Sequence, residues 1–565
     1  MNNPLLVVED LTVVYQEKQE EHIAVKRISF EVMPGEVVAL VGESGSGKSS
    51  TALALMGLLP QNAKAVASGI SYKNPSGKTE LNFDPQSGPG KLRGREMAMI
   101  FQNPSSAFNP VRKIGAQVEE VLAHTLEKSK TAVQQLIPDL YQRCGLSDPD
   151  AINNSYPHQL SGGQKQRVFI AMATAANPAL LIADEPTTAL DVTVQAKVIS
   201  LLKNLGSASG MSTLLISHDL ALVSDVADRV LVMRHGEIIE SGTTREIFRK
   251  PQKAYTKGLL LCRPPSDKRF ERLPVLSDFE SGTAHLPKIE NPADRQERLQ
   301  KMYAQEPVLK AENIVAAYKA NSGRLFRSEK KIVIPGLNLQ LFPGETLGLA
   351  GESGSGKTTL GKILAGLLPA DSGSIHFHNL EISGRKSNTA SPVQMVFQDP
   401  SSSFNPTLTM LEALMEPLRA LMKGHTDKEK IKLIQAMLEQ VQIPASALRK
   451  LPAEFSGGQI QRLAIARALL MQPKCVVFDE SVSSLDVSVQ AGILNLINKL
   501  KNQMKLSCVF ISHDLSVVRY MSDRVLIMKD GQIVEEGEAD TVFTNPSHAY
   551  TRELIDAIPQ VSISN

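Results

Sequence analysis

The stretch Gly42-Glu-Ser-Gly-Ser-Gly-Lys-Ser49 decides the fold, because it returns almost unchanged as Gly351-Glu-Ser-Gly-Ser-Gly-Lys-Thr358. Two other motifs also occur twice, the second copy 295 residues after the first. They are Ser161-Gly-Gly-Gln164 with Ser456-Gly-Gly-Gln459, and Ile216-Ser-His-Asp-Leu220 with Ile511-Ser-His-Asp-Leu515. Such long spacing indicates two related halves of about 260 residues rather than a solenoid of short repeats.

Each glycine-rich stretch follows a short apolar run, Val37–Val41 or Thr346–Ala350, and precedes an apolar helical segment. The pattern GxxxxGK[ST] in this context predicts a P-loop, whose backbone N–H groups face a triphosphate at a helix N-terminus. We expect Lys48 and Lys357 to reach the β- and γ-phosphates. The hydroxyls after them, on Ser49 and Thr358, suit Mg²⁺, which prefers oxygen ligands.

A second apolar run in each half ends in two carboxylates. Leu180–Ala183 precedes Asp184 and Glu185, and Val476–Phe478 precedes Asp479 and Glu480. Continuous apolar runs of this length are typical of buried parallel strands. We therefore expect the aspartates to hold Mg²⁺, directly or through water, and the glutamates to polarise the attacking water.

Together with the signature Leu160-Ser-Gly-Gly-Gln-Lys-Gln-Arg167 and its second copy Phe455-Ser-Gly-Gly-Gln-Ile-Gln-Arg462, these motifs resemble the nucleotide-binding domains of ABC transporters, twice over. The resemblance implies that Gln102 and Gln398 sense Mg²⁺, that His218 and His513 contact the γ-phosphate, and that Asp191 and Asp486 form D-loops. It implies that Tyr15 and Tyr318 stack on adenine, although a tyrosine in the core of a strand face is the alternative. The ATP-binding residues it implies are Tyr15, Gly42, Glu43, Ser44, Gly45, Ser46, Gly47, Lys48, Ser49, Ser50, Tyr318, Gly351, Glu352, Ser353, Gly354, Ser355, Gly356, Lys357, Thr358 and Thr359. The implied signature residues are Ser161, Gly162, Gly163, Gln164, Ser456, Gly457, Gly458 and Gln459. The implied metal-binding residues are Ser49, Gln102, Asp184, Thr358, Gln398 and Asp479. The implied catalytic residues are Glu185, His218, Glu480 and His513.

The fold class implied is α/β, with two tandem P-loop ABC ATPase domains. Each would contain a mainly parallel core sheet, an antiparallel β subdomain and a helical subdomain. We place the domains at residues 1–262 and 308–565, with a proline-rich, partly ordered linker over 263–307 that contains a short helix around Asp294–Tyr303. The polar segment Ser71–Gly94 is predicted to be a loop that accounts for most of the extra length of the first half.

The resemblance also implies a head-to-tail sandwich, in which ATP on Lys48 meets Ser456–Gln459 and ATP on Lys357 meets Ser161–Gln164. Both composite sites have every expected catalytic residue, so we expect two hydrolytic sites.

Three features resemble the oligopeptide, dipeptide and nickel importer group, whose fused members include glutathione importers. They are the segments Phe101–Pro110 and Phe397–Pro406, the residues before each signature, and the Tyr-Thr tails Pro251–Leu260 and Pro546–Ile555. The alternative for the tails is a surface helix that packs on its own domain. The resemblance implies ATP and Mg²⁺ as cofactors, two integral-membrane permease subunits and a solute-binding protein as partners, and a peripheral position on the cytoplasmic face of the inner (plasma) membrane.

Composition limits the other functions. The 565 residues include 61 Lys+Arg and 59 Asp+Glu, a net charge of +2 that does not require nucleic acid as a partner. The four cysteines form no CxxC pair, so we expect no zinc module and no disulfide framework. Some members of the importer group that the chain resembles have a Cys-rich C-terminal iron–sulfur motif, but only Cys262 lies near that region here, so we expect no iron–sulfur cluster. No apolar stretch of about 18 residues occurs, so no transmembrane segment is expected. Two alternatives remain: a soluble tandem ABC ATPase that acts on ribosomes or nucleic acid, and an exporter ATPase, which the lack of a fused membrane domain disfavours.

Overall fold

The computed structural model describes residues 3–17, 20–74, 77, 79–188, 190–265, 268–281, 287–319, 330–378, 380–382, 391–483 and 485–558. The chain divides into two compact units, which meet in sequence between Leu260 and Leu261. Each unit contains one six-stranded sheet and one smaller antiparallel sheet, so the predicted α/β class is confirmed.

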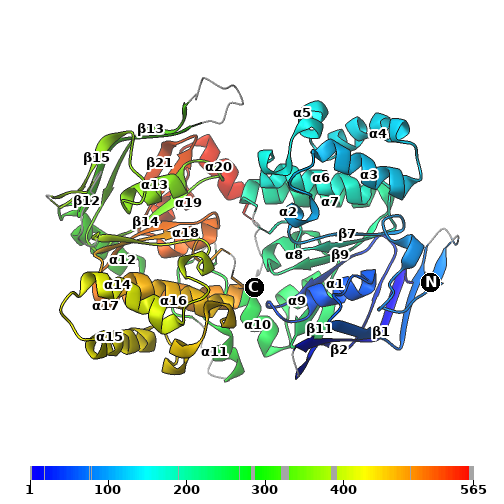
Figure 1. Cartoon of the computed structure of the whole chain (residues 1–565), viewed down its shortest axis with the longest axis horizontal. Helices are drawn as coiled ribbons and strands as arrows, with labels where there is room; N and C mark the ends of the chain where they lie inside the picture. The colour runs from blue at the N-terminus through cyan, green and yellow to red at the C-terminus, as the bar shows by residue number, and fades with distance from the viewer. Residues whose placement is uncertain are drawn as a thin grey trace. The chain divides into compact units, whose positions relative to one another are not determined.

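Unit 1 alternates strands with helices. Its elements are β1 (Leu6–Glu17), β2 (Glu20–Val32), β3 (Val37–Val41), α1 (Lys48–Met56), β4 (Ala63–Val66), β5 (Gly69–Lys73), β6 (Glu80–Asn82), β7 (Met97–Ile100), α2 (Pro104–Ala107), α3 (Ile114–Leu126), α4 (Lys130–Arg143), α5 (Pro149–Asn154), α6 (Gly162–Thr174), β8 (Leu180–Asp184), α7 (Val192–Ser209), β9 (Ser212–Ser217), α8 (Leu220–Val226), β10 (Arg229–Arg234), β11 (Glu237–Thr243), α9 (Thr244–Arg249) and α10 (Ala254–Leu261). Within this unit, helices α3–α6 gather on the side away from strands β1 and β2 (Figure 1).

Unit 2 follows the same order after two additional helices. Its elements are α11 (Leu276–Glu280), α12 (Pro292–Tyr303), β12 (Leu309–Lys319), β13 (Lys330–Leu341), β14 (Thr346–Ala350), α13 (Lys357–Leu364), β15 (Ser372–Phe377), β16 (Leu380–Glu381), β17 (Val393–Val396), α14 (Met410–Leu421), α15 (Asp427–Gln440), α16 (Gly457–Leu469), β18 (Cys475–Asp479), α17 (Val487–Met504), β19 (Ser507–Ile511), α18 (Leu515–Met521), β20 (Arg524–Lys529), β21 (Gln532–Glu538), α19 (Ala539–Thr544) and α20 (Ala549–Asp556). Helices α14–α16 (yellow in Figure 1) lie together on the side away from β12, β13 and β15.

The two six-stranded sheets have the same strand order. In unit 1 it is β11-β10-β3-β9-β8-β7, and in unit 2 it is β21-β20-β14-β19-β18-β17. Every neighbouring pair is parallel except the terminal hairpins β10–β11 and β20–β21. The central strands are buried along their whole length, which explains their continuous apolar sequences. Because the carboxyl ends of parallel strands meet at one edge, this topology brings residues that follow β3, β8 and β9 together.

Both terminal hairpins turn at a residue followed by glycine, and the backbone explains the sequence there. His235 has φ 48° and Gly236 has φ 85°, while Asp530 has φ 49° and Gly531 has φ 79°. A two-residue hairpin turn of this kind requires positive φ at both central positions, which glycine, aspartate and asparagine tolerate best.

The prediction of a loop over Ser71–Gly94 is wrong in part. Residues up to Lys73 complete β5, and β6 pairs with it, so the segment carries a hairpin. Ile70 and Tyr72 are buried on one face of β5, and the Tyr72 hydroxyl donates a hydrogen bond to Glu96 at 2.9 Å. The alternation of buried and more exposed residues in β5 covers only five residues, and polar and glycine residues surround it, so the sequence does not clearly indicate a strand here.

The segment predicted as a linker forms α11 and α12, and the helix expected around Asp294–Tyr303 is confirmed as α12. Cys262 and Leu273 are fully buried in the core cluster that also contains α14–α17. The described part of this segment therefore packs as a portion of unit 2.

Candidate functional site

The P-loop of unit 1 joins β3 to α1. Gly42 begins it with φ 152°, and a Cβ atom there would lie 2.2 Å from the carbonyl oxygen of Met233, so only glycine fits. The loop closes around the buried Lys48, whose amino group donates to the carbonyl oxygens of Gly42 at 2.8 Å and Glu43 at 2.7 Å. Gly47 is the N-cap of α1 and has no side chain to cap it, so the first N–H groups of the helix are placed for an anionic ligand.

The P-loop of unit 2 repeats this geometry. Gly351 has φ 144° and would place a Cβ atom 2.1 Å from the carbonyl oxygen of Met528. Lys357 donates to the carbonyl oxygens of Gly351 and Glu352, both at 2.8 Å. Two stretches 309 residues apart thus fold into the same phosphate-sized cradle.

The strand that ends in two carboxylates meets the P-loop in each unit. Ser49 Oγ donates to Asp184 Oδ1 at 3.1 Å, and Thr358 Oγ1 donates to Asp479 Oδ1 at 2.9 Å. Burial raises the pKa of Asp184 to about 6 and also raises the pKa of Asp479. Burial outweighs the opposing effects of the hydroxyl hydrogen bond and of the P-loop lysine charge, and a paired hydroxyl and carboxylate are the oxygen ligands that Mg²⁺ accepts. These residues therefore fit a magnesium ion.

The glutamate after this aspartate in unit 1 collects donors from other parts of the chain. Gln102 Nε2 donates to Glu185 Oε2 at 2.8 Å, and His218 Nδ1 lies 3.1 Å from Glu185 Oε1. Thr188 Oγ1 also donates to Glu185 Oε2 at 2.8 Å. Burial alone would raise the pKa of Glu185, but its hydrogen bond and charge interaction with His218 prevail and lower the pKa to about 2.

Unit 2 brings a glutamine and a histidine to the equivalent glutamate. Gln398 Nε2 donates to Glu480 Oε2 at 2.7 Å, and His513 Nδ1 lies 3.5 Å from the same oxygen. Burial again opposes ionisation, yet His513 lowers the pKa of Glu480. Both glutamates have positive φ, 46° at Glu185 and 45° at Glu480, a strained backbone for this residue type that marks sites where the surroundings fix the conformation.

The tyrosines predicted to stack on adenine contact the helix that follows each P-loop. The Tyr15 hydroxyl lies 3.1 Å from Ser50 Oγ, and the Tyr318 hydroxyl lies 3.2 Å from Thr359 Oγ1. Tyr15 packs against the core of unit 1, whereas 44% of Tyr318 is exposed. Adenine stacking on these rings stays a prediction.

Each signature opens a helix. Ser161 is the N-cap of α6 and Ser456 of α16, and their N–H groups donate to Gln164 Oε1 at 3.0 Å and to Gln459 Oε1 at 3.1 Å. The serine and the first glycine are exposed in both units. Asp191 and Asp486 are the N-caps of α7 and α17, the helices after the carboxylate strands.

Two residues outside the predicted set also contact the P-loops. The N–H of Glu43 donates to the hydroxyl of Tyr255 at 3.1 Å, and the N–H of Glu352 donates to the hydroxyl of Tyr550 at 3.0 Å. Both tyrosines are buried and belong to the Tyr-Thr tails, in α10 and α20. The sequence signal was the repetition of these tails, but nothing in it indicates a contact with a loop about 200 residues earlier in the chain.

The four cysteines are buried free thiols. No group of three or more His, Cys, Asp or Glu side chains in the described ranges is arranged to hold a metal ion. The absence of an iron–sulfur cluster stays a prediction. None of the helices that the structure describes combines the length and the apolar character that a membrane crossing requires.

Known protein families match both halves of the chain. The family described as "ABC transporter" matches residues 25–188 and 334–483, and the family described as "Oligopeptide/dipeptide transporter, C-terminal region" matches residues 239–288 and 534–564. The chain is 40% identical to the glutathione import ATP-binding protein GsiA of Escherichia coli K12 and 39% identical to that of Shigella flexneri, in each case over 98% of this chain and 89% of the relative. Similar solved structures include a dimeric bacterial ABC transporter cassette, MJ0796, and cbiO1 from Clostridium perfringens, part of the ABC transporter complex cbiONQ. Both are 25% identical with a TM-score of 0.37; the first alignment covers 41% of this chain and 98% of the cassette, the second 43% and 92%.

Proposed function

The chain belongs to the ABC transporter family as an ATP-hydrolysing import subunit, and from that premise we propose that it drives the uptake of glutathione or a related short peptide. The observation that carries this function is the convergence, in each unit, of a P-loop lysine, an Asp-Glu pair, a glutamine and a histidine. The glutathione import relatives support the choice of cargo. Nickel or a metal chelate is the alternative cargo for the same ATPase.

We assign the roles in hydrolysis as follows. The P-loops bind the phosphates of ATP, and Lys48 and Lys357 leave the loop carbonyls to reach the β- and γ-phosphates. Ser49, Asp184 and Gln102, with their counterparts Thr358, Asp479 and Gln398, hold Mg²⁺, which supplies positive charge where negative charge develops on the phosphate. In the structure the amide nitrogens of these two glutamines donate to the catalytic glutamates, so their amide oxygens are the atoms that would hold the ion.

Glu185 and Glu480 orient and polarise the attacking water. Their lowered pKa values keep them ionised at neutral pH, so they are hydrogen-bond acceptors for that water. His218 and His513 contact the γ-phosphate and position the glutamates.

The signatures complete these sites in a head-to-tail sandwich of the two units. Their exposed serine and first glycine, at the N-terminus of a helix, suit a phosphate that the opposite P-loop holds. ATP would then bind best when the units are closed, so it favours closure by that difference in affinity, and hydrolysis removes the preference. Fusion in one chain raises the effective concentration of each unit near the other.

The import function implies membrane permeases as partners. We propose two permease subunits and a solute-binding protein, with the chain on the cytoplasmic face of the inner (plasma) membrane. The match to the oligopeptide/dipeptide transporter C-terminal region supports this assignment.

The test is affinity purification of the tagged chain from gently solubilised native membranes, followed by uptake of labelled glutathione in cells. We expect two different permeases to co-purify with the chain. We expect uptake to be lost in a Lys48→Ala/Lys357→Ala variant. The control is Lys301→Ala, which removes an exposed lysine that pairs with Glu297 on α12 and should leave uptake unchanged. Recovery of ribosomes or nucleic-acid proteins without permeases would contradict the importer function. Uptake of a labelled dipeptide or nickel but not glutathione would reassign the cargo alone.

A further inference from the structure

The described residues between the two predicted domains, 268–281 and 287–303, form a strap on unit 2. A β-bridge joins Phe270 to Ile289, and α12 completes the strap. The backbone of the fully buried Leu273 exchanges two hydrogen bonds with the side chain of Asn495 in α17, at 2.9 and 2.8 Å. Although its prolines suggest a flexible spacer, the strap is ordered by specific contacts.

Two arginines of the strap hold the C-terminal end of α18. Arg269 donates to the carbonyl oxygens of Arg519 at 2.5 Å and Tyr520 at 2.6 Å. Arg295 donates to the carbonyl oxygen of Ser522 at 3.3 Å, just after the helix. The last carbonyls of a helix have no partner within it and carry partial negative charge, so two buried guanidinium groups stabilise this end in position.

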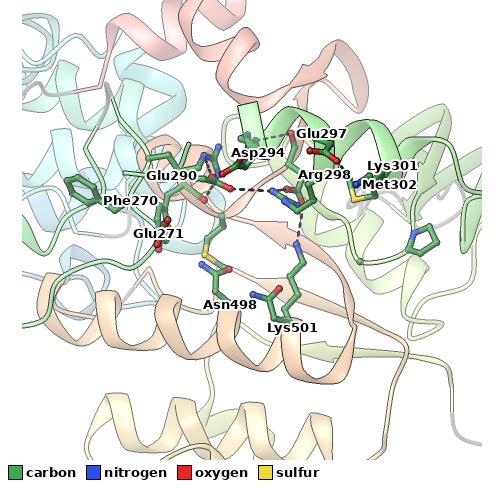
Figure 2. A pocket seen from close by; sticks show the side chains of 18 of the residues that line it. Phe270, Glu271, Glu290, Asp294, Glu297, Arg298, Lys301, Met302, Asn498 and Lys501 are labelled. Atoms are coloured by element: carbon green, nitrogen blue, oxygen red, sulfur yellow. Dashed lines mark hydrogen bonds and ion pairs between the residues drawn. The ribbon is translucent and has the colours of Figure 1, made fainter. Parts of the chain in front are cut away.

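Ion pairs fix the arginines in turn. Arg295 pairs with Glu538 at 2.8 Å, and Arg298 and Lys501 both pair with Asp523, at 2.9 and 3.1 Å. Figure 2 shows Glu290, Arg298 and Lys501 pointing toward one another across a pocket of about 830 Å³ between the strap and α17. Burial alone would raise the pKa of Asp523, but the charges of Lys501 and Arg298 hold it well below its usual range. The cluster is therefore charged and paired at neutral pH.

Unit 1 lacks the residues that receive the strap. Glu538 and Asp540 pair with Arg295, but their equivalents 295 positions earlier are Thr243 and Arg245. Lys501 and Arg519, which pair with Asp523 and Asp540, have Gly206 and Ser224 as their equivalents. Asp523 has a counterpart in Asp228, and both accept a hydrogen bond from the first residue of the strand that leads to the P-loop. The shared aspartate thus belongs to the common fold, although in unit 2 it also pairs with Arg298 of the strap. The other two acidic partners, Glu538 and Asp540, are specific to unit 2.

The helix that the strap holds begins at the second catalytic centre. Asp514 caps α18 by accepting from the N–H of Ser516 at 2.9 Å, and His513 directly precedes it, 3.5 Å from Glu480. With seven residues, α18 is about 10 Å long, so the arginines and the histidine act on the two ends of one short rigid element.

We propose that Arg269 and Arg295 are positioning residues of the second ATP site, which hold α18 so that His513 stays in register with Glu480. The effect on hydrolysis rests on the function proposed above. Because the described part of unit 1 has no equivalent of Glu538 and Asp540, the acidic partners of the strap, the two ATP sites respond differently to changes in this segment.

The first test measures α18 directly and does not require hydrolysis. Hydrogen–deuterium exchange of the full chain compares wild type, Arg269→Gln, the conservative Arg269→Lys, and the control Lys301→Ala. We expect at least fivefold faster exchange over 515–521 in Arg269→Gln, partial recovery in Arg269→Lys, and no change over 220–226 in any variant. Unchanged exchange over 515–521 in Arg269→Gln would overturn the proposal.

The second test measures each ATP site alone. In a Glu185→Gln background the remaining hydrolysis comes from the second site, and in a Glu480→Gln background it comes from the first. We expect Arg269→Gln to lower kcat at least fivefold in the first background, with KM for ATP changed less than twofold, and to have little effect in the second. An equal loss in both backgrounds would show a general structural role and overturn the proposal. Absence of hydrolysis in the wild-type chain and its permease complex would instead contradict the proposed function, and the exchange experiment would still decide the role of the strap.

Discussion

Replacing the tail tyrosines by phenylalanine removes a hydroxyl that accepts a hydrogen bond from each P-loop. In Tyr255→Phe and Tyr550→Phe the ring keeps its place, because both side chains are buried and each lies beneath a cation, Arg234 at 4.8 Å or Lys529 at 4.5 Å from the ring centre. The change therefore removes only the hydroxyl that accepts from the N–H of Glu43 or Glu352.

The expected magnitude follows from that bond. A neutral hydrogen bond contributes about 0.5–1.5 kcal/mol, and every 1.4 kcal/mol is tenfold in affinity. If the bond holds the P-loop in its binding conformation, the double tyrosine variant binds ATP roughly two- to twelvefold more weakly at each site.

The assay is isothermal titration of ATP in a Glu185→Gln/Glu480→Gln background, which prevents turnover. Tyr141→Phe is the matched control, because it removes the hydroxyl of a buried tyrosine that donates to Asn153 at 3.1 Å, outside the P-loop. An unchanged affinity in the tail variant, or an equal loss in Tyr141→Phe, would refute the assignment.

Three further predictions concern the fold and the buried charges. Gly42→Ala should abolish ATP binding at the first site in a nucleotide titration, because its Cβ would lie 2.2 Å from the Met233 carbonyl oxygen. The control Gly206→Ala should be tolerated, because the nearest atom to its Cβ would be 3.5 Å away. Arg524→Met should destabilise unit 2 by about 3–5 kcal/mol in thermal unfolding, because it leaves the fully buried Glu345 without the cation 2.8 Å away. The control Lys73→Met breaks the exposed ion pair with Glu80 and should cost less than about 1 kcal/mol. Asp523→Asn should lower the melting temperature most at neutral pH. The pKa of Asp523 is depressed in the fold, so its contribution to the free energy of unfolding is present above the unfolded pKa of about 3.9 and is lost progressively as the pH falls below that value. The difference in melting temperature between Asp523→Asn and wild type should therefore shrink below about pH 4. A constant difference down to pH 3 would contradict this.

The sequence was sufficient for the groups that local motifs define. Lys48 is placed by its own loop, and Asp184 and Glu185 are placed by the end of their strand, so the parallel order of the sheet alone brings them together. Gln102 and His218 were expected only from the resemblance to ABC transporter domains, and they follow β7 and β9, the neighbours of β8 in the sheet.

The sequence was insufficient where the partner lies far along the chain. Tyr255 meets Glu43 across 212 residues, and Arg269 meets Tyr520 across 251. From the sequence alone, an arginine in a proline-rich segment is expected to be solvated. Its hydrogen bonds and ion pairs depend on tertiary packing, which no local sequence pattern indicates. The strap was therefore predicted as a linker.

The most direct test of two hydrolytic sites is the steady-state ATPase rate of Glu185→Gln and Glu480→Gln, measured singly and together in the chain bound to its permeases. Loss of a positioned carboxylate that activates water typically costs a factor of about 10²–10⁴ at its own site. We predict that each single variant loses at least half of the wild-type rate and that the double variant loses nearly all of it. A single variant that hydrolyses ATP as fast as wild type would contradict the account, because only one of the two sites would then be catalytic.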